Sequence, residues 1–120
     1  MAEEKQLALY TITSVVLSPG PANSVLAQIN FEGAAQGLGK ILATETFVVG
    51  KSTTYSQCAM IYADNGDILT YTSQGTYEII GPFKWRRQGI GRVSDGRTLA
   101  VGGEMDLIAR TFTSKYSSND

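Results

Sequence analysis

Apolar and polar residues alternate along most of this chain, in stretches that have the length of β-strands. The clearest case is residues 24–32, where Val25, Ala27, Ile29 and Phe31 alternate with Ser24, Gln28, Asn30 and Glu32. A period of two places such apolar side chains on one face of a strand. Residues 34–41 are the one stretch that could be taken for a helix, and Gly37 and Gly39 argue against it. The eight predicted strands are 7–17, 24–32, 37–49, 52–63, 67–80, 83–93, 97–108 and 110–116.

Turn sequences separate these strands. Asn65-Gly66 predicts a two-residue hairpin loop, because this dipeptide accepts two successive positive φ angles. Gly50-Lys51 predicts a second two-residue loop, and Ser94-Asp95-Gly96 predicts a three-residue loop with glycine in the left-handed position. Proline cannot take that position, so Gly81-Pro82 predicts a longer loop of five residues.

Eight antiparallel strands joined by tight turns fit either a sandwich or a closed up-and-down barrel. We favour the eight-stranded antiparallel up-and-down β-barrel, because closure removes exposed sheet edges. The length of 120 residues predicts a single all-β domain over residues 1–120, with 1–6 and 117–120 expected to fray.

The loop lengths also predict which side chains face the interior of the barrel. They pair Glu45 with Ser56, Trp85 with Met105, and Arg87 with Gly103. One predicted interior layer is rich in aromatic residues. Its members are Phe47, Thr54, Tyr77, Trp85 and Met105. The two layers in the middle contain many small residues. They are Ala43, Cys58, Ser73, Gly89 and Val101, and Glu45, Ser56, Gly75, Arg87 and Gly103. A waist lined by small side chains predicts a hollow barrel.

Glu45 and Arg87 are the two charges that this register turns inward, and a buried charge requires a partner. If they are catalytic, Glu45 would act as acid, base or hydrogen-bond acceptor, and Arg87 would stabilise an enolate or carboxylate. The alternatives are a structural ion pair, or a register error that leaves both in solvent. The predicted ligand-binding residues are Phe47, Ser56, Cys58, Met60, Tyr71, Ser73, Tyr77, Trp85 and Met105. Core packing is the alternative for Tyr71, Tyr77 and Trp85, and a buried apolar role is the alternative for Cys58.

Composition excludes several function classes. Without histidine and with one cysteine, the chain has no ordinary zinc site and no Ser-His-Asp or Cys-His device. The net charge of -1 argues against a nucleic-acid partner. No stretch approaches the roughly 18 apolar residues of a membrane span, and the acidic N-terminus lacks a signal core. The sequence therefore predicts a cytoplasmic protein with no cofactor, no metal and no membrane partner.

Residues 74–116 resemble the C-terminal half of small calycin-like barrels and of allene oxide cyclase-like barrels, which include natural-product cyclases. The resemblance rests on Gly75-Thr76-Tyr77-Glu78, Lys84-Trp85-Arg86, Ser94-Asp95-Gly96-Arg97 and Gly103-Glu104-Met105-Asp106-Leu107. It implies a homodimer or homotrimer whose lumen folds an apolar substrate for a cofactor-free cyclisation or isomerisation. Three functions are therefore expected: a cyclase or isomerase of a biosynthetic pathway, a non-catalytic carrier of a hydrophobic ligand, or a packed structural module.

Overall fold

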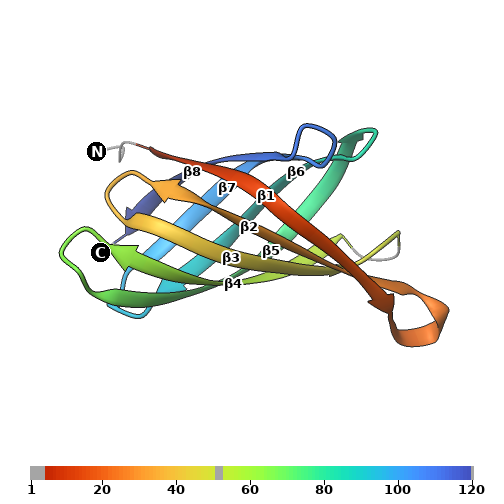
Figure 1. The fold of residues 1–120 in the computed structure, drawn as a ribbon, viewed down its shortest axis with the longest axis horizontal. Helices are drawn as coiled ribbons and strands as arrows, with labels where there is room; N and C mark the ends of the chain where they lie inside the picture. Colours follow the sequence, from red (N-terminus) through yellow and green to blue (C-terminus); the bar gives the residue numbers. More distant parts are fainter. Residues whose placement is uncertain (1–4, 51–52, 120) are drawn as a thin grey trace.

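A computed structural model describes residues 5–50 and 53–119 of the chain. These residues form a closed barrel of eight antiparallel strands in which each strand pairs with the next and β8 pairs with β1 (Figure 1). The strands are β1 (Gln6–Pro19), β2 (Val25–Ala35), β3 (Gly39–Val48), β4 (Thr54–Ala63), β5 (Ile68–Gly81), β6 (Lys84–Val93), β7 (Thr98–Asp106) and β8 (Thr111–Asn119). The predicted all-β, eight-stranded up-and-down barrel is confirmed, and this architecture is compatible with a calycin-like fold.

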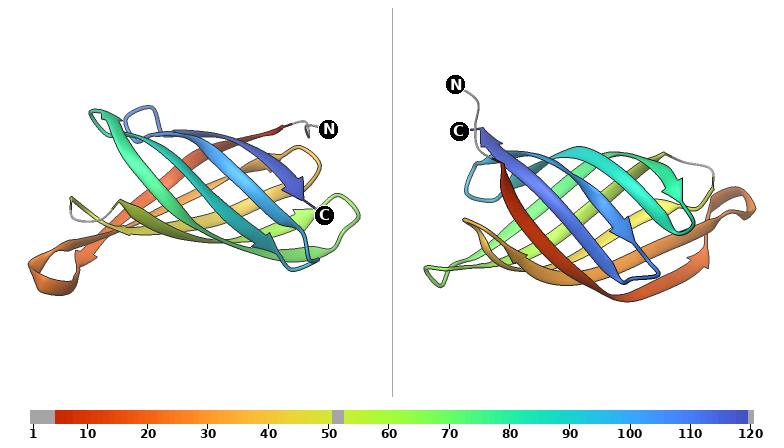
Figure 2. Two further views of the ribbon diagram at one scale, coloured as in Figure 1. Left: turned by 180° about the vertical axis from the view of Figure 1, so that it is seen from behind. Right: turned by 90° about the horizontal axis from the view of Figure 1, so that it is seen from above.

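The barrel has two distinct ends. The start of β1 and the end of β8 lie at one end, which we call the terminal end (Figures 1 and 2). The loops β1–β2, β5–β6 and β7–β8 lie at the opposite end, together with the end of β3 and the start of β4, and we call it the distal end (Figure 1). The β1–β2 hairpin, which contains the 3-10 turn Pro21–Asn23, projects furthest there. Its strand β1 pairs with β8 only from Gln6 to Thr11, so the rest of β1 pairs with β2 alone.

The β4–β5 loop differs from the prediction and changes the face of a whole strand. Gly66 has a φ of +95°, and the loop contains three residues, because Ala63 N donates to Asp67 O at 2.8 Å. Tyr55 therefore pairs with Gly75, where the prediction pairs Ser56 with Gly75. Since side chains alternate, a slip of one residue turns β4 over. On the other side of β4 the shift is the same: Glu45 pairs with Gln57 rather than with Ser56.

The β6–β7 loop agrees with the prediction. Gly96 has a φ of +102°, Val93 N donates to Arg97 O at 2.9 Å, and Trp85 pairs with Met105 as expected. The β5–β6 loop is shorter than the predicted five residues, because Gly81 pairs with Lys84 next to a bulge. This change shifts the pairing of β5 with β6 by two residues and therefore leaves the predicted faces of both strands unchanged.

Two further predictions concern chain ends and a turn. β8 continues to Asn119 by pairing with β7, so the frayed tail does not begin at Ser117. β1 begins at Gln6, and residues 1–4 and 120 lie outside the described residues. The predicted two-residue loop at Gly50-Lys51 includes residues 51–52, which also lie outside them.

The core occupies the interior of the barrel. Its largest fully buried side chains are Phe31, Ile29, Ile61, Met105 and Val93. In the interior, Tyr10, Phe31 and Phe112 form a ring cluster with centroids 5.0–5.2 Å apart. Among the residues that the structure describes, no helix is long and apolar enough to cross a membrane.

Candidate functional site

A buried ion pair occupies the middle of the barrel. Glu45 comes from the centre of β3 and Arg87 from the centre of β6, and they are only 3% and 4% exposed. Arg87 Nη1 contacts Glu45 Oε1, and Arg87 Nη2 donates to Gln57 Oε1 at 2.5 Å. The guanidinium carbon lies 4.2 Å from the ring centroid of Tyr55 and 4.3 Å from that of Phe112. The predicted inward orientation of Glu45 and Arg87 is confirmed, and the solvent-exposed alternative is wrong.

Burial and pairing act on the charge of Arg87 in opposite directions. Burial lowers the pKa of the Arg87 guanidinium to about 9, and the phenol of Tyr10 opposes this shift. A charge in such a position is tolerated when an opposite charge and further hydrogen bonds satisfy it. Glu45, Gln57 and the two aromatic faces supply these interactions. The Glu45 carboxylate and the Arg87 guanidinium therefore stay in contact with each other in the interior of the protein.

Sequence reasoning missed Gln57 and Tyr55 as neighbours of Arg87. Both belong to β4, whose predicted register points them outward, whereas the structure buries both. The signal that could have identified them is the pattern of β4 itself. Tyr55, Gln57, Ala59 and Ile61 form an alternating row that a three-residue loop at 64–66 turns inward.

The waist of the barrel is filled, so the predicted hollow lumen is wrong. The small residues of β6 provide space for tyrosine rings from β4 and β5. A Cβ atom added to Gly91 would lie 2.0 Å from the Tyr71 hydroxyl, and one added to Gly89 would lie 2.5 Å from the Tyr55 hydroxyl. The space that remains beside Arg87 and Tyr71 is about 30 Å³. This volume holds about two water molecules and is far below the roughly 300–1,000 Å³ of a small-molecule pocket.

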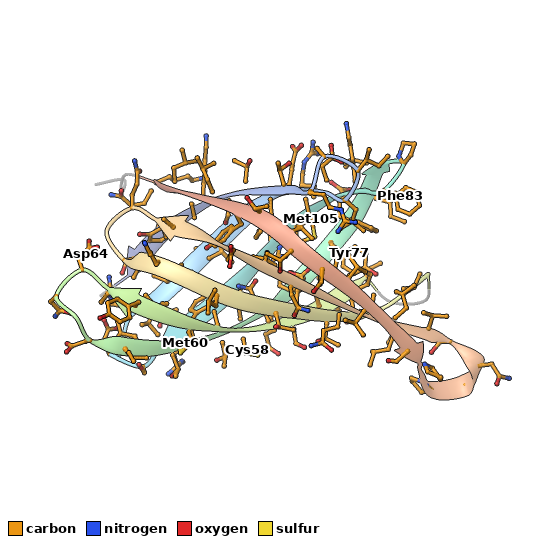
Figure 3. All side chains as sticks on the ribbon, viewed as in Figure 1. Cys58, Met60, Asp64, Tyr77, Phe83 and Met105 are labelled. Atoms are coloured by element: carbon orange, nitrogen blue, oxygen red, sulfur yellow. The ribbon has the colours of Figure 1, made fainter. Side chains whose placement is uncertain are left out.

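Three predicted ligand-binding residues face away from the interior. Ser56, Cys58 and Met60 lie on the outer face of β4 and are exposed, because of the one-residue change in register (Figure 3). The prediction that they line the lumen is wrong, as is the inward position of Thr54 and the alternative of a buried Cys58. Other predicted members, Tyr71 and Ser73 of β5, do face inward and are buried.

An aromatic layer lies between the ion pair and the distal end. The ring centroids of Phe47 and Tyr77 are 5.2 Å apart, and those of Phe47 and Trp85 are 5.8 Å apart. Phe47 is buried, while Tyr77 and Trp85 are partly exposed, and Met105 is buried beside Trp85. These four predicted side chains do face the interior close to one another, but Trp85 pairs with Ile79, where the predicted layer pairs it with Tyr77. Figure 3 shows Tyr77 and Met105 towards the distal end of the barrel.

Beyond this layer, the interior-facing rows continue with apolar residues that nothing in the described chain covers. Leu17 pairs with the buried Ala27, and Ile79 pairs with Trp85, so both share the interior face of their strands. Val25 and Val49 continue the interior rows of β2 and β3 in the same way. These four residues are 43–70% exposed, and we call them the apolar rim. The apolar rim and the aromatic layer together form the candidate site.

The candidate site contains no group that would hold a metal ion. Among residues 5–50 and 53–119, no three His, Cys, Asp or Glu side chains come close enough together to hold one. The chemistry that the rim and the aromatic layer can supply is therefore apolar contact, ring stacking and shape.

Alkaline pH is expected to unfold the protein through its buried tyrosines. Burial raises the pKa of Tyr10, Tyr55 and Tyr71 above the usual 10.0. Above pH 10 the unfolded chain loses protons that the folded chain keeps, so stability falls as the pH rises, by about 1.4 kcal/mol per pKa unit and group. The lowered pKa of Arg87 has the opposite effect on stability: above pH 9 the folded chain loses a proton from Arg87 that the unfolded chain keeps. This is one group, whereas three tyrosines act in the destabilising direction.

The measurement compares tyrosinate absorbance at 295 nm with far-UV circular dichroism during an alkaline titration. The ionisation of the buried tyrosines should coincide with loss of the β-sheet signal. The double variant Tyr55→Phe/Tyr71→Phe should move this transition to higher pH. Smooth ionisation of all six tyrosines with the fold intact would contradict the prediction.

The chain was compared with protein-family models, with curated proteins and with solved structures, and none of the three comparisons found a match. The candidate site is therefore defined by its own geometry: a packed barrel with a buried ion pair, covered by an aromatic layer whose distal side carries an uncovered apolar rim.

Proposed function

We propose that the protein is a carrier that binds an uncharged, apolar small molecule at the distal end of the barrel. The observation that carries this proposal is the apolar rim, where interior-facing side chains such as Ile79 are up to 70% exposed. Inward-facing apolar residues of a barrel are normally covered, and exposed apolar clusters mark sites of interaction. The loop residues Phe83 and Ile108, 62% and 70% exposed at the same end, extend the apolar surface.

The chemistry of the site defines the ligand class. The partly exposed rings of Tyr77 and Trp85 offer faces on which a flat or conjugated molecule can stack. The nearest interior charges, Glu45 and Arg87, are buried beneath the layer and paired with each other. An anionic or cationic group on the ligand would therefore find no interior partner without breaking that pair, which favours an uncharged ligand.

A cyclase or isomerase, as the sequence resemblance implies, is the second candidate for the same site. The aromatic layer supports it, because a rigid apolar surface can hold a flexible substrate in a reactive conformation. Such catalysis would depend on shape and orientation at the apolar rim. Acid–base chemistry by Glu45 would require the buried ion pair to open, and we therefore place this role second.

The first test uses the single tryptophan of the chain as a reporter. Titration with the neutral probe N-phenyl-1-naphthylamine should quench Trp85 emission and give energy transfer that saturates at one probe per barrel. An unchanged Trp85 emission over the accessible probe range would overturn the proposal and favour the packed structural module.

A pair of variants locates the binding surface. Ile79→Lys places a charge on the rim and should weaken probe binding at least tenfold. Ile90→Lys is the matched control, since Ile90 is a similarly exposed isoleucine on the outer face of β6 (63% against 70%), and it should change binding less than twofold. Equal effects of the two variants would show that the probe binds elsewhere.

A further inference from the structure

The outer surface of the barrel carries few charges on β1 to β5 and many on β6 to β8. Between Lys40 near the start of β3 and Glu78 near the end of β5, the outward-facing residues of β3, β4 and β5 are uncharged, and we call this surface the uncharged wall. Its residues are Leu42, Thr44, Thr46, Val48, Thr54, Ser56, Cys58, Met60, Tyr62, Ile68, Thr70, Thr72, Gln74 and Thr76. Charged residues make up 18% of the whole chain, and such residues are mostly found on the surface. Fourteen neighbouring positions without a single charge therefore require an explanation.

The strands on the other side of the barrel show the contrast. Six outward-facing residues of β6, β7 and β8 are charged: Lys84, Arg86, Arg92, Glu104, Asp106 and Lys115. Some of them form surface ion pairs across the strands, such as Lys84 with Asp106 at 3.7 Å and Arg86 with Glu104 at 3.4 Å. The same sheet thus supplies a solvated, charged surface on one side only.

The uncharged wall also carries large apolar side chains. Leu42 pairs with Met60 and Tyr62 pairs with Ile68, so the four form one cluster, and each is 46–62% exposed. Leu42, Met60 and Cys58 line a shallow surface hollow of about 510 Å³. Protein–protein interfaces have this composition at their centre, where charges are depleted and aromatic residues and methionine are enriched. Threonines elsewhere on the wall lose little side-chain entropy when covered, because they are stiff at χ1.

We propose that the uncharged wall is the interface between two copies of this chain in a two-fold dimer. Two identical uncharged surfaces can meet without placing like charges against each other, while the charges of β6–β8 stay in water. A two-fold interface is formed by the same surface on both subunits. Neighbouring strands lie about 4.8 Å apart, and successive outward residues of one strand lie about 6.8 Å apart. The fourteen positions of the wall therefore cover roughly 500 Å². Two such footprints bury roughly 1,000 Å² in total, which is at the lower limit of a specific interface.

Cys58 reports on this interface directly. It is the central outward residue of β4, and β4 is the central strand of the wall. Figure 3 shows Cys58 beside Met60 on the outside of β4. A two-fold axis near the centre of the wall brings the Cys58 side chains of both copies into the interface. Its thiol is exposed in one isolated copy and covered in the dimer.

The experiment measures mass by sedimentation equilibrium from about 1 to 200 µM. Wild-type protein should reach twice the chain mass of 12.9 kDa. Met60→Lys should raise the dissociation constant of the dimer at least a hundredfold, because it buries an unpaired charge. Leu9→Lys is the matched control, since Leu9 is an exposed outward residue on β1 (55% against 46%), and it should change the constant less than threefold. Both positions are exposed, so circular dichroism should show both variants folded.

A second readout follows Cys58 itself. The rate of its reaction with 5,5′-dithiobis(2-nitrobenzoate) should fall at least tenfold between monomeric and dimeric concentrations, and Met60→Lys should abolish this difference. A wild-type protein that stays monomeric at 200 µM would overturn the proposal. A trimeric mass would overturn it too, as would a dimer that tolerates Met60→Lys and leaves Cys58 reactive.

Discussion

Arg87→Met is expected to lower the free energy of unfolding by about 3–5 kcal/mol, because it leaves the buried Glu45 carboxylate without its partner. Glu45→Met should cost a similar amount by isolating the guanidinium. For a chain of this length, such a loss corresponds to a decrease in Tm on the order of 10–20 °C. Urea denaturation followed by circular dichroism measures the effect.

The double variant Glu45→Met/Arg87→Met tests the physical reason. If the cost comes from an uncompensated charge, removing both charges should restore most of the stability, since apolar residues of similar volume often replace a buried ion pair at little cost. A large coupling energy in the double-mutant cycle is therefore expected. Additive losses would contradict this account.

Arg86→Met is the matched surface control for Arg87→Met. Arg86 is the neighbouring arginine on β6, faces solvent, and lies 3.5 Å from Glu78 and 3.4 Å from Glu104. Exposed ion pairs contribute about 0–1 kcal/mol, so this variant should keep nearly the stability of the wild type. Variants of Glu45 that remain stable yet lose probe binding at the distal end would instead assign the pair to the binding site.

Gly75→Ala is the second substitution with a large expected effect, about 3 kcal/mol of destabilisation. A Cβ atom at Gly75 would lie 2.1 Å from the carbonyl oxygen of Gln88 and 2.6 Å from the Cα atom of Gly89. Both atoms belong to the backbone of β6, so no side-chain rotation can relieve the overlap. The two strands would have to move apart at the position where Gly75 pairs with Gly89, next to the Tyr55 hydroxyl.

Gly102→Ala provides the control for this effect. Gly102 also lies within a strand, but a Cβ atom there would have its nearest neighbour at an ordinary 3.5 Å, from the carbonyl oxygen of Arg87. This variant should be neutral or slightly stabilising, because alanine reduces the conformational entropy of the unfolded chain. Urea denaturation of both variants provides the comparison, and equal stabilities would contradict the steric argument.

The register of β4 shows where sequence reasoning reached its limit. The loop at 64–66 can be built with two or three residues between the paired ends, and Gly66 supplies a positive φ angle in both cases. The residues of β4 do not distinguish between the two loop lengths, because both faces of this strand carry a mixture of apolar and polar residues. In β6 the alternation is clearer, and the inward positions of Trp85 and Arg87 followed from it.

The sequence by itself determined the eight strands, their antiparallel order, the inward direction of Glu45 and Arg87, and the aromatic layer of Phe47, Tyr77 and Trp85. These features depend on local signals, namely the period of two along each strand and the residues of each turn. The tertiary structure alone decided how the interior is filled and what its distal end exposes. The glycines of β6 suggest an empty waist, but tyrosine rings from other strands occupy the space beside them. The volume at each level of a barrel is shared between strands, so the sequence of one strand alone does not show whether that volume is filled.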